Sequence, residues 1–199
     1  MTSVAGEWWR SVLHMIYPHL CKGCAADLAR REQSLCAVCL AALPLTGFEK
    51  HAGNPAEKIF FGRTPIMSAM SLLYFTQDSL VRSIIHQIKY DDARSLAVFM
   101  GRMMGQAMVS GGRFRQAELL VPLPLSPGRE KQRGYNQSAL LAEGMAQVTG
   151  LPVASRALAR KSQLGTQTHR SREERWLQMH AQFVCPNPPA LEGRSLVLV

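Results

Sequence analysis

Residues 119–138 read LLVPLPLSPGREKQRGYNQS and combine an apolar run, a basic loop and the start of a helix. The run 119–123 predicts a short buried strand, with Pro122 near its end. Three cations lie in the loop, and the helix expected over 137–149 would end at Gly150. Backbone amides at a helix start attract anions, and flanking cations strengthen that attraction. The stretch therefore predicts a phosphate-binding loop or, as the simpler alternative, a solvated basic loop.

The segments around this stretch alternate between amphipathic repeats and apolar runs. Apolar residues at helical spacing predict helices over 80–88, with Asp78 or Ser79 as N-cap, and over 94–109, where the methionines belong to the core. The run 195–199 is β-branched and apolar, which suits a central parallel strand. We therefore expect an α/β fold, a mostly parallel sheet with helices on both faces.

The remaining segments are assigned by shorter signals. Residues 67–75 are apolar enough for a strand, whereas the prolines and glycines of 44–65 predict an irregular linker. A short amphipathic helix is expected over 7–17, and a capping box at 171–174 predicts the start of another helix.

Four cysteines form two CxxC pairs, Cys21/Cys24 and Cys36/Cys39, separated by eleven residues. Such turns direct thiolates at one ion, and two of them complete a tetrahedral S₄ site that leaves no open position for water. We therefore expect one structural zinc ion, rather than reduced cysteines without metal, thioredoxin-like chemistry or catalytic zinc. Around this site, Gly23 is expected to adopt a positive φ, Leu20 and Leu35 to cover the ion, and Cys185 to be a small buried hydrophobe.

The composition indicates a globular protein with a strongly basic balance. The 199 residues carry a net charge of +9, with a pI near 9.8, which favours nucleic acid or anionic ligands such as phosphates. No apolar run is long enough to cross a bilayer, and the first twenty residues do not resemble a signal peptide. A cytoplasmic location is expected, where thiols stay reduced.

The motifs IHQIKY (85–90) and RGYNQS (133–138), together with the cysteine pairs, resemble those of the ComF family. Gln167, eight residues before Arg175, also fits, with Phe183 eight residues further on. The resemblance implies an N-terminal zinc ribbon (1–62, with helix and linker) and a type I phosphoribosyltransferase-like domain (63–199). It further implies a link to DNA uptake and competence.

This resemblance also implies a ligand site for phosphoribosyl diphosphate or a related phosphate, with Mg²⁺ accompanying the diphosphate. Gln167 and Arg175 match a polar pair that comes later in the family pattern. His86 is interpreted as structural, and no residue is assigned a catalytic role. The ligand-binding candidates are Lys89, Tyr90, Arg129, Lys131, Arg133, Gly134, Asn136 and Gln137.

One part of the family pattern is missing. The strand at 195–199 should lead into two acidic residues and a Thr-Thr-Gly-Thr-like loop that binds the 5-phosphate, but the sequence given stops at Val199. Asp91 and Asp92 follow a helix and are interpreted as a solvated turn. We therefore expect a fragment or a truncated domain, with doubtful transferase activity.

Two other functions remain open. A non-enzymatic accessory could bind single-stranded DNA through the zinc ribbon, with binding that weakens as salt rises. Alternatively, the ribbon could act only as a protein docking module. The residues considered for DNA contact are Lys22, Arg30, Arg31 and Lys50, with Trp8 and Trp9 as stacking candidates.

Overall fold

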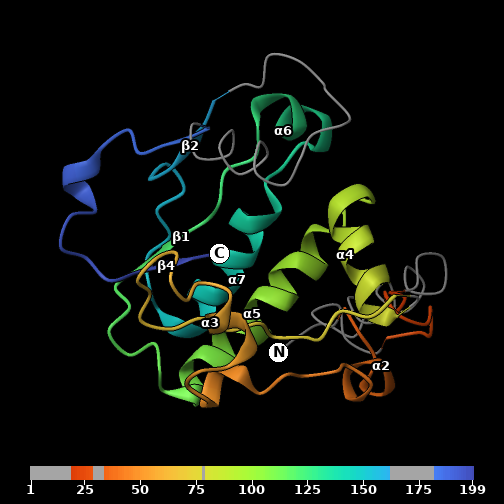
Figure 1. Cartoon of the computed structure of the whole chain (residues 1–199). Helices are drawn as coiled ribbons and strands as arrows, with labels where there is room; N and C mark the ends of the chain where they lie inside the picture. The colour runs from red at the N-terminus through yellow and green to blue at the C-terminus, as the bar shows by residue number, and fades with distance from the viewer. Residues whose placement is uncertain (1–18, 29–33, 78, 162–181) are drawn as a thin grey trace, which may run out of the picture.

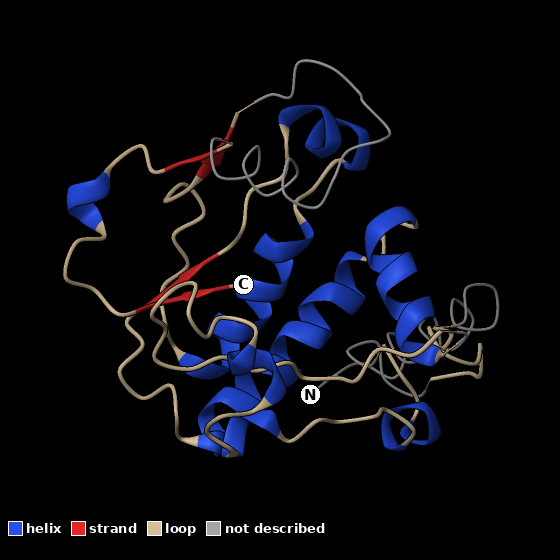
Figure 2. Cartoon of the chain, in the orientation of Figure 1, coloured by secondary structure: helices blue, strands red, loops and turns tan. Residues whose placement is uncertain are grey.

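The computed structural model describes residues 19–28, 34–77, 79–161 and 182–199 (Figure 1). Helices dominate these residues, and the strands are short (Figure 2). The expected helices over 7–17 and from 171 lie outside the described residues. In chain order the elements are α2 (Ala37–Ala41), η1 (Phe48–Lys50), α3 (Pro55–Lys58), α4 (Leu80–Tyr90), α5 (Arg94–Gly111), β1 (Leu119–Val121), α6 (Pro127–Arg133), α7 (Gln137–Thr149), β2 (Ala159–Arg160), β3 (Phe183–Val184), η2 (Pro188–Ala190) and β4 (Leu196–Leu198).

The parallel pair β1–β4 forms the sheet that positions the basic stretch. Leu120 pairs with Val197 in β4, and an isolated parallel bridge joins Leu120 to Val153 on the other side. All three residues of β1 are buried, and Leu120 packs in one core cluster with Met108 of α5 and with Ala142 and Met145 of α7. The fold is thus mixed α/β with a small parallel sheet, as predicted.

The prediction of a central position for the 195–199 strand is wrong within the described residues. Here β1 takes the middle position, and β4 has one partner strand. Leu196 and Leu198 are exposed, whereas Val197 and Val199 pack against the core, so the described residues cover only one face of this strand.

Helices α5 and α7 pack against each other through glycines. A Cβ atom on Gly101 would collide with the backbone carbonyl of Leu141, and one on Gly144 would collide with that of Val98. The two helix backbones therefore touch, and their flanking apolar side chains form the core. The predicted boundaries of α7 are confirmed, and Gly150 ends the helix with φ 72°.

Helix α4 begins where the sequence predicts. Ser79 is the N-cap, because its Oγ accepts a hydrogen bond from the Arg82 N–H at 3.3 Å. Val81, Ile84 and Ile88 are buried on one face. The core prediction for the methionines of α5 is confirmed, since Met100 is buried and Met103 and Met104 are partly buried against the core.

Three predictions for irregular or extended segments are wrong. The predicted linker over 44–65 contains η1 and α3, and the expected strand over 67–75 is an extended loop. That loop meets the chain around Leu45 through an isolated bridge to Leu73 and lacks the ladder of a strand. The basic loop after β1 contains helix α6, because Pro127 starts it and Gly134, at φ 75°, ends it.

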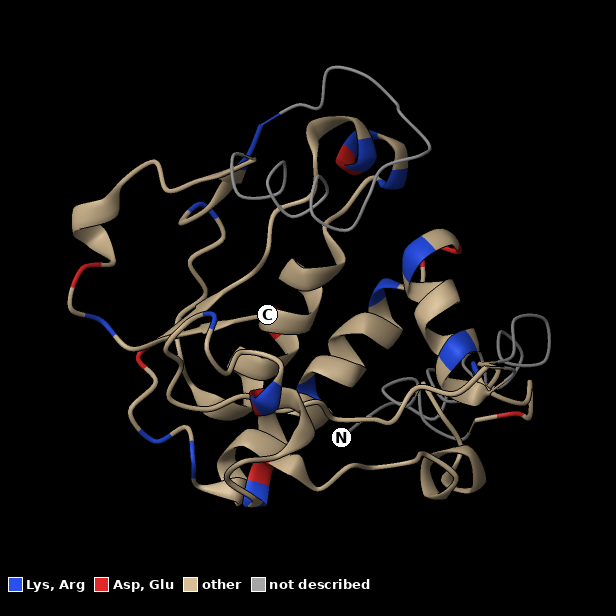
Figure 3. Cartoon of the chain, viewed as in Figure 1, with Lys and Arg blue, Asp and Glu red and all other residues tan. Residues whose placement is uncertain are grey.

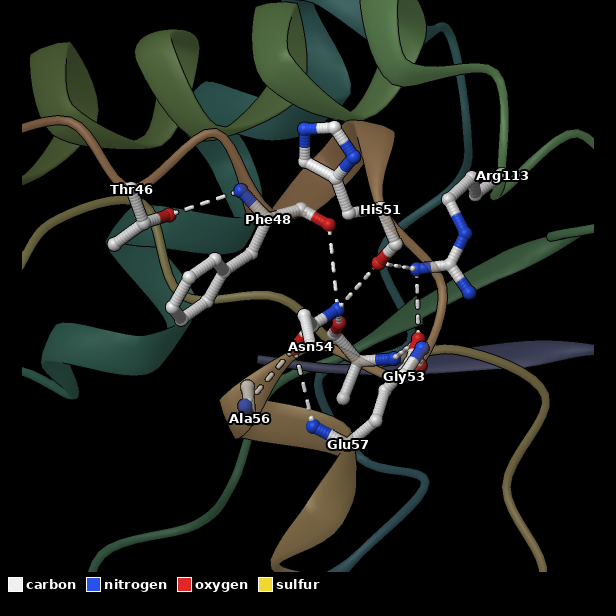
Figure 4. Close-up of polar contacts among 9 residues, drawn as sticks. Thr46, Phe48, His51, Gly53, Asn54, Ala56, Glu57 and Arg113 are labelled. Atoms are coloured by element: carbon white, nitrogen blue, oxygen red, sulfur yellow. Dashed lines mark hydrogen bonds and ion pairs between the residues drawn. The ribbon is translucent and has the colours of Figure 1, made fainter.

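A buried polar network holds the segment around α3 in place (Figure 4). The Asn54 side chain caps α3 by accepting from the Ala56 and Glu57 N–H groups, and donates to the carbonyls of Phe48, His51 and Ala69. Because one amide serves five backbone groups, α3 is fixed despite having four residues.

Glu57 and Arg113 form the charged part of this network. An Arg113 guanidinium nitrogen lies 2.7 Å from Glu57 Oε1, and both side chains are largely buried. The Gly53 and Ala69 N–H groups also donate to the carboxylate. Burial alone would raise the pKa of Glu57, but these donors and the charge of Arg113 outweigh burial and lower it. The pair ties α3 to the chain just after α5.

Candidate functional site

The four predicted cysteines converge on one point. Their sulfur atoms all lie within 4.8 Å of one another, and the sulfurs of Cys24 and Cys36 are 3.6 Å apart. Cys36 is the N-cap of α2, so this short helix places Cys39 on the side of the first CxxC pair. The second pair is thus positioned by the start of a helix and the first by a turn.

This donor set fits a tetrahedral metal ion. Four sulfurs at about 2.3 Å from zinc would lie about 3.8 Å apart, close to the spacing found. Four thiolates without a nitrogen or oxygen ligand are typical of a closed structural zinc site. The cluster can therefore hold a metal such as zinc, in agreement with the prediction.

The two buried cysteines have opposite electrostatic surroundings. Burial raises the pKa of Cys21, but hydrogen bonds from the backbone N–H groups of Cys36, Cys24 and Gly23 lower it overall to about 6. Burial and the neighbouring sulfurs raise the pKa of Cys39 to about 12. Crowded thiols of this kind favour a cation among them, because a cation stabilises every thiolate at once.

Two predictions about the surroundings of the cysteines need correction. Gly23 does not have a positive φ; Ala25 has one instead. A Cβ on Gly23 would lie 2.7 Å from Cys39 Sγ and 2.9 Å from the Leu80 side chain. Glycine is therefore required there for close approach. Leu35 is buried against the cluster as expected, whereas Leu20 is exposed, because it forms an isolated bridge with Asp27 at the edge.

The cysteine cluster and α4 are in direct contact. Gln87 Nε2 donates to the Lys22 carbonyl at 2.7 Å, and the core cluster that contains Cys21 and Cys39 also contains Ile84 and Ile88. A shallow hollow of about 510 Å³ follows this side of α4, lined by Ser79, Arg82, Ser83, His86, Gln87 and Asp91. The hollow does not include the basic stretch after β1.

The predicted ligand residues of α4 and of the basic stretch meet in space. The Arg133 guanidinium lies over the Tyr90 ring, 5.3 Å from its centroid, and donates to Gln137 Oε1 at 2.8 Å. Asn136 is the N-cap of α7 and also donates to the Leu123 carbonyl at 2.9 Å. We call Tyr90, Arg133, Asn136 and Gln137 the Tyr90–Gln137 cluster. It joins residues that lie more than forty positions apart in sequence.

Tyr135 connects this cluster to α4 by a buried hydrogen bond. Its hydroxyl donates to the Ile88 carbonyl at 2.5 Å, and its ring is buried. Burial and the nearby Asp92 raise the pKa of Tyr135, so the phenol stays a donor. The Arg94 guanidinium lies over the ring at 4.9 Å and pairs with Asp92 at 2.7 Å. The sequence interpretation missed Arg94, although its spacing from Asp92 at the start of a helix was a usable signal.

The other predicted ligand residues are placed less closely. Arg129 and Lys131 are exposed on α6, Gly134 ends that helix, and Lys89 is half-buried on α4. Basic residues on α4 and α6 are visible in Figure 3. Gln167 and Arg175 lie outside the described residues, as do Arg30, Arg31, Trp8 and Trp9. Cys185 is half-buried, and His86 is an exposed residue that pairs with Asp91 at 3.5 Å.

Curated relatives align with this chain over 92–100% of its length. A DNA utilization protein YhgH from Salmonella typhimurium is 26% identical over 204 residues, covering 100% of this chain and 85% of the relative. Proteins of that name from Salmonella typhi and Escherichia coli K12 are 26% and 24% identical. No protein-family model and no solved structure matches the sequence. Among the described residues, no helix has the length and apolar character needed to span a membrane.

Proposed function

We propose that this chain takes part in the use or uptake of DNA, and that it binds phosphoribosyl diphosphate or a related phosphate at the Tyr90–Gln137 cluster. The relatives' name supports the first part. The observation that carries the second is the contact of Arg133 with both Tyr90 and Gln137, which unites two distant motifs at one place. Mg²⁺ would accompany the diphosphate as its counter-ion.

The cluster has the chemistry of an anion site. Arg133 is half-buried and held by Gln137, so its guanidinium loses little freedom when it binds phosphate oxygens. The Asn136 side-chain oxygen caps α7 by accepting from the Ser138 N–H. The other backbone N–H groups of the first turn of α7 lie beside it, and such groups attract anions. Arg129 and Lys131 on the preceding helix add positive potential. We assign binding only, without an acceptor or a catalytic residue.

Zinc has a structural role in this proposal. It would be held by Cys21, Cys24, Cys36 and Cys39, whose segment packs directly on α4. Loss of the ion would therefore disturb the helix that carries Tyr90. A boundary between a zinc-binding part (1–62) and a ligand-binding part (63–199), a cytoplasmic location and contacts with competence proteins remain predictions.

Substitution of Arg133 tests the ligand site. Arg133→Ala is expected to weaken binding of phosphoribosyl diphosphate by at least about tenfold, since hydrogen bonds to charged groups contribute about 1.5–3 kcal/mol. Calorimetric titration with Mg²⁺ present measures this, and inorganic pyrophosphate serves as a second ligand. Arg194→Ala removes an equal charge from an exposed turn and should bind normally. Equal affinity of the two variants would remove Arg133 from the site.

A second candidate function is an accessory protein that binds single-stranded DNA. The net charge of +9 and the name of the relatives favour it. Lys22, exposed beside the cysteine cluster, and the exposed Lys50 fit contacts with phosphates. Binding to an oligonucleotide should then fall steeply between low and high salt, and absence of binding at low salt would exclude this candidate.

A further inference from the structure

The segment after α3 exposes aromatic side chains between two cations. We call residues 58–64, which start at the last residue of α3, the aromatic loop; the chain can be followed beyond α3 in Figure 1. Phe61 is 63% exposed and Phe60 39%, although both are large apolar residues. Lys58 and Arg63, at the two ends, are also exposed. With Ile59, which is 62% exposed, the two phenylalanines form a run of three exposed apolar side chains, and such a run can mark an interaction site.

Backbone hydrogen bonds and the support of α3 order the aromatic loop. Backbone hydrogen bonds join the Phe60 N–H to the Glu57 carbonyl at 2.9 Å and the Arg63 N–H to the Phe60 carbonyl at 3.0 Å. The loop starts from α3, which Asn54 and the buried Glu57–Arg113 pair hold in place (Figure 4). Its two phenyl rings are therefore presented from a fixed support, which reduces the entropy lost when they bind a partner.

The charges around the loop have one sign at the surface. The acidic residues of the segment 44–75 are Glu49 and Glu57, and both are buried. The exposed charges of the same segment, Lys50, Lys58 and Arg63, are all positive. The segment thus presents aromatic rings next to cations and has no exposed carboxylate. These groups complement a polyanion whose flat apolar groups can stack on the rings.

We propose that the aromatic loop binds single-stranded nucleic acid, with Phe60 and Phe61 stacking on bases while Lys58 and Arg63 contact phosphates. Stacking requires unpaired bases, which a duplex does not offer. A second copy of this chain fits less well, because a two-fold contact at the loop would bring both pairs of cations together. The inference rests on the second candidate function above and adds the surface that performs it, apart from the Tyr90–Gln137 cluster.

The test is a titration of the full chain with fluorescein-labelled oligodeoxythymidine, followed by anisotropy at several salt concentrations. Phe61→Ala should weaken binding about tenfold without changing the salt dependence. Lys58→Gln and Arg63→Gln should each reduce the slope of log K against log salt by about 0.7. Phe75→Ala is the matched control, since Phe75 is 60% exposed but has no Lys or Arg within four positions; it should bind as the parent does.

Three results would overturn the inference. If the parent chain does not bind the oligonucleotide at low salt, both the surface and the second candidate function fail. If it binds but Phe61→Ala and Phe75→Ala behave alike, DNA binding stands and the aromatic loop is not its site. If Phe61→Ala instead abolishes self-association in light scattering and spares DNA binding, the loop contacts a second copy. Thermal melts of each variant establish that it is folded.

Discussion

At the scale of single residues, a few polar side chains connect segments that are far apart in sequence. Tyr135 bonds to the last turn of α4 through Ile88, while Arg133 contacts Tyr90 and Asn136 bonds to Leu123, just after β1. Asn54 similarly serves five backbone groups around α3. Loss of Asn54 would therefore leave several backbone groups without a partner, and loss of the Tyr135 hydroxyl would remove a buried bond to Ile88.

Glu57 should make the stability of the fold depend on acid. Its pKa is lowered in the folded chain, so its contribution is present above the ordinary carboxyl pKa and is lost as pH falls through the folded pKa. Glu57→Gln should cost about 3–5 kcal/mol at neutral pH, because Arg113 is left buried without its partner. Urea denaturation at neutral and acid pH measures both effects.

The matched control for this prediction is Glu192→Gln, which removes an exposed carboxylate. It should change the free energy of unfolding by less than about 0.5 kcal/mol. If Glu57→Gln were equally mild, or if its stability kept the same dependence on acid as the parent, the buried pair would not stabilise this segment.

At the scale of elements, the close approach of α5 and α7 determines the core. The two helices meet at Gly101 and Gly144, where either added Cβ would overlap the opposite backbone. The apolar side chains beside the contact, Met100 and Met145 among them, are buried as a result. Packing of this kind leaves little room for adjustment, since backbone atoms cannot rotate away.

Gly144→Ala should therefore destabilise the chain, although alanine is the better helix former. We expect a loss of about 1–3 kcal/mol from overpacking, measured by chemical denaturation. Gly128→Ala is the control, because Gly128 lies in α6 with open space around its Cα, and the change should be neutral or stabilising by up to about 1 kcal/mol. A stabilised Gly144→Ala would contradict the backbone contact.

At the scale of the whole molecule, the sequence predicted those parts that depend on local patterns. Helices α4, α5 and α7, the strand β1 and the cysteine cluster follow from periodicity, capping residues and spacing. The network of Asn54, Glu57 and Arg113 could not be predicted, because it depends on a contact between residues 57 and 113 that no local pattern encodes. For the same reason, the structured segment 44–65 was expected to be an irregular linker.

The candidate ligand site shows the same division. The motif residues were identifiable, but the contact of Arg133 with Tyr90 required the fold, and Arg94 was missed because it acts through Tyr135. Gly23 was identified for the wrong reason, since its spacing in a CxxC turn suggested a positive φ where the structure needs close approach. Burial was also overestimated for the strand β4 and for Leu20.

The metal content of the purified chain tests the account most directly, because α4, which carries Tyr90, packs on the cysteine segment through Ile84 and Ile88. Mass spectrometric metal analysis of protein purified under reducing conditions should find one zinc ion per chain. The variant Cys39→Ser should lose most of the ion, whereas Cys185→Ser, outside the cluster, should retain it. A parent chain without stoichiometric zinc, or equal zinc in all three proteins, would contradict the account.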